Sequence, residues 1–222
     1  MKPTMDPDSS QFESLLDDAN RAILHSLASP WEIQRYLDSL PYVGEELNRS
    51  PLRVIQDTQC HCLDGGLLAA LCLRRLGYPA LLLDLLPEPG TDDDHVLAIF
   101  QRGGKYGAVA KSNYAGLRFR EPVYRGLREL VMSYFEVFFN VEGRKTLRGY
   151  TRPLNLAAYD RYHWQTTQPG VDRVVARLYS LRVVPVLSAE EAAALHPVDK
   201  RSYQAGMLGA NPDGLFKPGE PH

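Results

Sequence analysis

A cysteine at a predicted helix start is the first residue in this sequence that could do chemistry. Cys62 opens the segment CLDGGLLAALCLRRLG, in which leucines recur at helical spacing. In the first turn of a helix, free backbone N–H groups and the helix dipole favour an anion, which lowers the pKa of a thiol. A thiolate is a nucleophile, and a nearby imidazole can hold it as an ion pair. Cys62 is therefore the candidate nucleophile.

The candidate partner is a histidine at a predicted strand start. His95 opens the apolar run HVLAIFQ, directly after the acidic loop TDDD at 91–94. Placed at the sheet edge that faces the helix start, its imidazole could take the thiol proton. A residue of the neighbouring strand would then orient the ring. We expect Cys62 and His95 to form a thiol–imidazole pair.

Apolar spacing and turn residues predict the elements that must position this pair. Helices are expected over 11–27, from Ser29 to about Leu40, over 62–76, over 123–140 and from Ser188 to about Leu195. Strands are expected over 80–86, 95–101 and 105–111, with a hairpin turn at Arg102–Lys105. Segment 173–187 fits a helix or a strand, and 51–61 carries few signals of either. A helix followed by antiparallel strands is the α+β pattern.

This stretch resembles the transglutaminase-like domains of the papain-like cysteine protease superfamily. The family has a helix-start cysteine, an acidic residue two positions on, a Gly-x-Pro turn, a strand, a loop and a strand-initial histidine. The matching positions here are Cys62, Asp64, Gly77, Pro79 and, after ALLLDLL and PEPGTDDD, His95. The resemblance covers about residues 52–115. It implies an α+β, papain-like fold in which the cysteine-bearing helix packs on an antiparallel sheet, with flanking helices.

The third member of the family's catalytic set departs from the pattern. The position of the usual aspartate falls near Ala110. Asn113 is the first candidate to orient His95 instead, because an amide oxygen can accept from the ring N–H as in papain-like enzymes. Ser112 is the second candidate.

Three further residues are expected to support the same site. Papain-like enzymes place an oxyanion-hole glutamine at the spacing of Gln56 from the cysteine, and such a donor stabilises a tetrahedral oxyanion. Gln59 lies closer in sequence and is an alternative. Asp64 is the acidic residue two positions after Cys62.

Other interpretations of these residues stay open. Cys60 could be the nucleophile instead, although it lacks the register to Gly77. A metal site of Cys60, Cys62, Asp94 and His95 is a further alternative, but Cys-x-Cys is not the usual zinc spacing. No metal and no organic cofactor is expected, since thiol-based acyl transfer needs neither.

Composition limits the function classes. The chain has 222 residues and a net charge of −2 with no dense Lys/Arg stripe, so nucleic-acid binding is not expected. No apolar run is long enough to span a bilayer, and the polar first residues lack a signal peptide, so a cytoplasmic protein without membrane contact is expected. The odd cysteine count argues against a disulfide framework.

Together these features predict one domain and two possible functions. Residues 1–10 are expected to be an arm, 11–200 a single transglutaminase-like domain and 201–222 a tail that wraps the surface or is mobile. As an enzyme, the domain would transfer or hydrolyse an acyl group of a peptide, protein or small amide. Alternatively, it is catalytically degenerate and binds a peptide or a partner protein.

Overall fold

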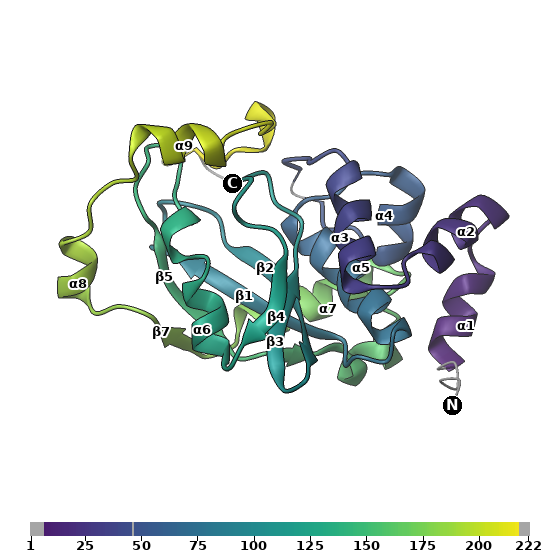
Figure 1. Ribbon diagram of the computed structural model, residues 1–222. Helices are drawn as coiled ribbons and strands as arrows, with labels where there is room; N and C mark the ends of the chain where they lie inside the picture. Colours follow the sequence, from purple (N-terminus) through teal and green to yellow (C-terminus); the bar gives the residue numbers. More distant parts are fainter. Residues whose placement is uncertain (1–6, 46, 218–222) are drawn as a thin grey trace.

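An antiparallel sheet forms the centre of the molecule (Figure 1). The computed structural model describes residues 7–45 and 47–217. Within these ranges the sheet has seven strands in the order β4-β3-β2-β1-β5-β7, with β6 also beside β1. The strands are β1 (Leu81–Pro87), β2 (His95–Arg102), β3 (Lys105–Val109), β4 (Arg120–Tyr124), β5 (Leu147–Thr151), β6 (Leu154–Asn155) and β7 (Val183–Pro185).

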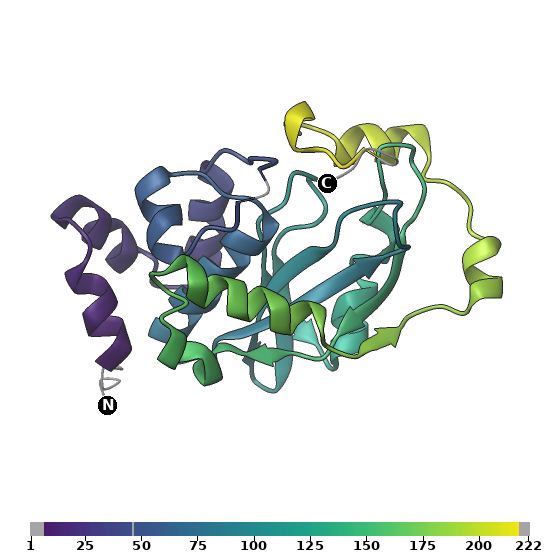
Figure 2. The same ribbon diagram turned by 180° about the vertical axis from the view of Figure 1, so that it is seen from behind.

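Helices cover both faces of the sheet (Figures 1 and 2). The α-helices are α1 (Pro7–Ser14), α2 (Asp18–Ser26), α3 (Pro30–Ser39), α4 (Pro51–Asp57), α5 (Cys62–Arg75), α6 (Leu127–Met132), α7 (Gln168–Tyr179), α8 (Ala189–Ala193) and α9 (Lys200–Gly206). Short 3₁₀ helices are η1 (Phe135–Val137), η2 (Leu156–Tyr162) and η3 (Pro212–Gly214). One core joins α3, α5 and α7 to the sheet, and a second joins α6 to the opposite face.

Strand β2 contributes alternate side chains to these two cores. Val96, Ala98 and Phe100 belong to the core that contains α5. Leu97 and Ile99 belong to the core that contains α6. Because successive side chains of a strand point to opposite faces, any residue of β2 can be assigned to one face from its position.

Helix α5 approaches the sheet closely through two glycines. A Cβ atom on Gly65 would lie 2.4 Å from Cβ of Lys111, and one on Gly66 would lie 2.9 Å from Cγ1 of Val96. Glycine has a low helix propensity, but a larger side chain at either position would clash with the neighbouring side chain. The helix stops before Gly77, whose φ of +89° is in the left-handed region.

Several predicted elements are confirmed. Helix α3 begins after Ser29, whose side chain accepts from the Glu32 backbone N–H, and α5, β1, β2 and β3 match their predicted ranges closely. The β2–β3 turn has Gly103 and Gly104 at positive φ. Ser188 caps α8 with the predicted capping box.

The predictions were wrong at both flanks of this core. The expected helix over 11–27 is two helices, because Asp17 caps a new start by accepting from the Asn20 backbone N–H. Helix α4 was missed, although Ser50 caps it just before Pro51. Of the expected arm, residues 1–6 lie outside the described residues, and α1 already begins at Pro7.

The expected long helix over 123–140 is also wrong. Its beginning is part of β4, which pairs with β3 through Tyr124 and Tyr106. Gly126 then caps the short helix α6, and η1 follows. The ambiguous segment 173–187 contains both alternatives, the end of α7 and then β7. Aromatic side chains here fill the second core, so tertiary packing overrides the local helical spacing.

The end of the chain folds back onto the sheet edge near α5 (Figure 1). Helix α9 is anchored by Ala115, whose N–H donates to the Gly206 carbonyl at 2.8 Å. The tail predicted over 201–222 thus wraps the surface as far as Lys217, and 218–222 lie outside the described residues. None of the helices in the described ranges is long and apolar enough to cross a membrane.

Candidate functional site

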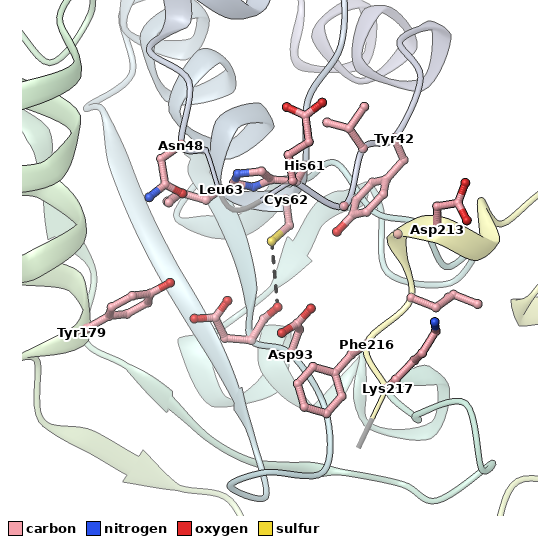
Figure 3. Close-up of a pocket in the computed structure, with 16 residues that line it drawn as sticks. Tyr42, Asn48, His61, Cys62, Leu63, Asp93, Tyr179, Asp213, Phe216 and Lys217 are labelled. Carbon is pink, nitrogen blue, oxygen red and sulfur yellow. Dashed lines mark hydrogen bonds between the residues drawn. The ribbon is translucent and has the colours of Figure 1, made fainter. Parts of the chain in front are cut away.

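A pocket of about 420 Å³ opens at the N-terminus of α5. Figure 3 shows the sulfur of Cys62 directed into it. Segments far apart in the sequence supply its walls: residues 42–45, Asn48, residues 61–63, Asp93, Asp94, Tyr179 and residues 213–217. The helix start predicted to carry a reactive thiol therefore does border a cavity large enough for a side chain or a short peptide segment.

The Cys62 thiol lies among oxygen atoms. Its Sγ–H donates a hydrogen bond of 3.9 Å to the backbone carbonyl of Asp94 (Figure 3). Burial, followed by the nearby carboxylate of Asp94, raises the pKa of Cys62 well above that of an ordinary thiol. These effects outweigh the helix dipole, so Cys62 is a neutral thiol at physiological pH in this arrangement.

Carboxylates dominate the charge of the pocket. Glu45, Asp93, Asp94 and Asp213 line it, against one lysine, Lys217, and Glu45 is paired with the Arg49 guanidinium. The pKa of Asp94 is raised to about 6, mainly by burial and then by the negative charge of Asp93. A hydrogen bond from the Tyr179 side chain to the Asp94 carboxylate opposes this rise. The acidic loop at 91–94 is thus partly buried at Asp94.

A further carboxylate, Asp84, is buried directly behind the pocket. It lies on β1 opposite Val96, on the α5 face of the sheet, and is fully inaccessible to solvent. Neither of its oxygens makes a hydrogen bond of ordinary geometry among the described residues, and the backbone N–H of His95 is the polar group that acts on it to lower its pKa. Burial, with the charge of Asp94 next, raises the pKa of Asp84 well above its usual range. The charge of Asp84 also contributes to the raised pKa of Cys62.

His95 is directed to the other face of the sheet. As the first residue of β2 it has the orientation of Leu97 and Ile99, which face α6. The ring nitrogen Nε2 lies 2.6 Å from the Leu117 carbonyl, so it carries the proton and donates. Burial, and then the Arg120 guanidinium, lowers the pKa of His95 to about 4, which keeps the ring neutral at pH 7.

The structure does not bring the predicted pair into hydrogen-bond contact. Within residues 7–45 and 47–217, no hydrogen bond joins Cys62 to His95. The thiol donates to the Asp94 carbonyl and the imidazole donates to the Leu117 carbonyl. Both groups are neutral at pH 7, which is the opposite of a thiolate–imidazolium ion pair.

The residues predicted to orient His95 line one small cavity together with it, but they hydrogen-bond other groups. Asn113 bonds the C-terminal segment, donating from Nδ2 to the carbonyls of Asn211 at 2.8 Å and Gly214 at 3.0 Å. Ser112 accepts through Oγ from the backbone N–H of Tyr114 at 3.0 Å. The ring of His95 is instead held by a backbone carbonyl, a partner that no side-chain pattern in the sequence signals.

The predicted oxyanion residues are not at the pocket. Gln56 is exposed on α4, Gln59 lies in the turn before α5, and neither lines the cavity. Asp64 has a structural role, because its carboxylate accepts from the backbone N–H of Arg49 at 2.6 Å and of His61 at 3.4 Å. Burial raises the pKa of Asp64 to about 7.

The alternative nucleophile and the metal site also lack support here. Cys60 is completely buried, and burial raises its pKa to about 12. In the described part of the chain, no group of three or more His, Cys, Asp or Glu side chains is arranged to hold a metal ion.

The pocket-lining residues that the sequence did not indicate come from distant segments. Tyr42, Tyr179 and residues 213–217 reach the pocket only through the tertiary fold. One signal was present in the sequence: Asp84 interrupts the apolar run ALLLDLL, and a charge in a buried strand demands an explanation.

Fold and site together define a mixed protein of helices and an antiparallel sheet, with a cysteine at the start of the central helix. No family model matches the chain, and a search of curated proteins also found no match. Two solved structures of Legionella pneumophila LapG are similar to part of it, one from an EGTA-treated sample.

The EGTA-treated LapG structure aligns over 47% of this chain and 69% of its own. The other aligns over 52% of this chain and 89% of its own. In both alignments the sequence identity is 13% and the TM-score 0.36. This likeness is too slight to transfer any property, so the arguments that follow use only the residues of this chain.

Proposed function

We propose that this chain is a transglutaminase-like domain whose Cys62 pocket binds a basic peptide or amine-bearing ligand in the cytoplasm, without covalent chemistry. The observation that carries the proposal is the environment of Cys62. Its thiol donates to the Asp94 carbonyl among carboxylates, while His95 is hydrogen-bonded on the other face of the sheet. A neutral thiol without a base is a poor nucleophile.

The charge of the pocket supports a cationic ligand. Four carboxylates line it against the one lysine Lys217, and His61 has a pKa lowered to about 4 by burial, so it carries no charge at pH 7. An ammonium or guanidinium group that enters such a pocket forms charge-assisted hydrogen bonds to carboxylates. An acidic ligand would meet like charge, which lowers its affinity.

A matched pair of peptides tests this proposal. Two amidated hexapeptides that differ only in carrying lysine or glutamate at the central position are titrated by fluorescence polarisation. The lysine peptide should bind at least about tenfold more tightly. Asp94→Asn should remove most of this preference, and Asp172→Asn, on the exposed surface of α7, should keep it. Equal affinity for both peptides would contradict the proposal.

Cysteine-dependent acyl transfer or amide hydrolysis is the second candidate. It is favoured by one observation, the position of Cys62 as the first residue of α5 with its sulfur facing the pocket. In this candidate, a rearrangement first brings the His95 ring to the α5 face. Cys62 then attacks the acyl carbon of an amide, the C–N bond breaks, and His95 passes the thiol proton to the leaving amine. Water or a second amine finally takes the acyl group from the thioester. Asn113 or Ser112 would orient the ring in that rearranged state.

An acyl-based thiol probe distinguishes the two candidates. If the domain is an enzyme, the probe should label Cys62 at neutral pH, and His95→Gln should abolish the labelling. If the pocket only binds its ligand, labelling of Cys62 should be slow in both proteins. Mapping the modified residue excludes Cys60 and Cys72, which are fully buried.

A further inference from the structure

The C-terminal segment Asn211–Lys217, here called the tail segment, forms one wall of the Cys62 pocket. Residues 213–217 of this segment line the cavity together with Cys62. Figure 3 shows Phe216 beside Asp93, with Lys217 farther along the same wall. The pocket proposed to take a basic peptide is therefore already bordered by a peptide segment that contains an aromatic residue, Phe216, and a basic residue, Lys217.

Asn113 holds the tail segment by its backbone. The Asn113 side chain donates to the carbonyls of Asn211 and Gly214, and its Oδ1 accepts from the Asn211 N–H at 2.7 Å. A primary amide that makes all three bonds to main-chain atoms recognises a peptide conformation and not a particular side chain. Asn113 could therefore hold another peptide in the same way.

Two glycines allow the tail segment to lie directly on the loop that carries Tyr42. A Cβ on Gly214 would lie 2.7 Å from Cδ1 of Tyr42, and a Cβ on Gly44 would lie 2.5 Å from the Asp213 carbonyl. The Asn211 side chain also donates to the Tyr42 carbonyl at 2.9 Å. The contact is close, but most of the segment is only half-buried, so another peptide could displace it.

We infer that the tail segment is a built-in occupant of a peptide site at Asn113, next to the Cys62 pocket that it walls, and that an external peptide binds by displacing it from Asn113. This inference rests on the proposed function, because it names how the ligand of that pocket gains access. The segment limits access to Cys62 as long as its bonds to Asn113 persist. The ligand is then a peptide whose backbone replaces the carbonyls of Asn211 and Gly214.

The test weakens the docking of the tail segment in the full chain. Gly214→Val places a side chain against Tyr42, whereas Gly126→Val adds the same atoms where no atom lies within 4 Å and serves as the control. The probe is a fluorescent peptide with the sequence of residues 211–217, NPDGLFK. Gly214→Val should bind it at least about tenfold more tightly than the wild type or the control.

A second measurement follows the alkylation of Cys62 by iodoacetamide. Gly214→Val should increase the rate about tenfold, since a masking segment reduces the accessible fraction of the pocket. Asn211→Ala, which removes the bond to the Tyr42 carbonyl, should shift both measurements in the same direction and covers the case in which Gly214→Val does not fold.

The outcomes separate the two proposals. Unchanged alkylation and unchanged peptide affinity in both tail variants would overturn the inference. If lysine peptides bind wild type and Gly214→Val equally tightly, the binding function stands and the displacement is refuted. If alkylation accelerates but no peptide binds either variant, the tail segment masks the pocket, and the peptide-binding function and displacement by a ligand both fail.

Discussion

Strand β2 separates two chemically different regions near its first residue. On the α5 face, Cys62 and the buried carboxyl of Asp84 share a polar, acidic environment next to a pocket of about 420 Å³. On the α6 face, His95 lines a cavity of about 40 Å³ beside Leu117 and Phe138. The two cavities adjoin, because Asp93, Asp94 and Phe216 line both. The larger cavity has room for a ligand, and the smaller one holds a neutral ring in place.

The difference shows that a shift of one residue along a strand decides which face of the sheet a side chain occupies. Val96 packs against Gly66 of α5, and the preceding residue His95 must therefore face the other way. Helix α5, which begins at Cys62, thus packs on one face of the sheet, and the His95 side chain belongs to the other face. Four measurements test whether the two faces differ in this way.

The largest expected effect is a loss of folding stability at acid pH, caused by His95 on the α6 face. The His95 pKa is lowered to about 4, so the unfolded state binds a proton between about pH 6.5 and pH 4 that the folded state does not. Stability is thus full above pH 6.5 and falls as the pH drops, by about 3 kcal/mol from His95 alone. In His95→Gln, which can still donate to the Leu117 carbonyl, this part of the loss should disappear.

Urea unfolding at a series of pH values measures this effect. His61, whose pKa burial also lowers to about 4, remains in both proteins and should leave a smaller loss in the variant. Parallel stability curves for the wild type and His95→Gln would mean that His95 is not held neutral on a closed face.

The next effect concerns the close approach on the α5 face. Gly66→Val would force its side chain against Val96 and should lower the free energy of unfolding by about 2 kcal/mol. Gly126→Val, in open space, should cost clearly less. Thermal and urea unfolding measure both, and an equal cost for the two variants would show that α5 does not depend on contact with β2.

A smaller effect is expected from the buried carboxyl. The raised pKa of Asp84 means that the folded state keeps a proton which the unfolded state releases above about pH 4, so stability falls as the pH rises. Asp84→Asn does not titrate and should be more stable than the wild type by roughly 1 kcal/mol at neutral pH. The advantage should shrink towards pH 4. A variant that is destabilised at every pH would show that the Asp84 carboxylate is satisfied after all.

The central unit of this fold was predictable because its signals are local. The hydrophobic spacing after Cys62, the stop at Gly77 and the Gly103–Gly104 turn each specify one element without help from distant residues. The structure of segment 123–140 was not predictable, because its aromatic side chains pack in a core that forms only when the sheet has folded.

Of the site, only the position of the cysteine was predictable. The helix start specifies where Cys62 lies, but no local pattern reveals that Asn113 binds residues 98 and 101 positions away in the sequence. Likewise, the partner of His95 is the backbone carbonyl of Leu117, which any residue at that position would supply. Contacts of this kind depend on the tertiary structure, so the residue types in the sequence do not indicate them.

The most direct test of the account is the pH dependence of Cys62 alkylation in the wild type and in His95→Gln. A neutral thiol among carboxylates predicts slow alkylation at pH 7 and a rate that rises about tenfold per pH unit up to about pH 9. The two proteins should give the same profile, because His95 lies on the other face of the sheet. A fast rate that is constant between about pH 6 and pH 9 and collapses in His95→Gln would contradict the account and establish a thiolate–imidazolium pair.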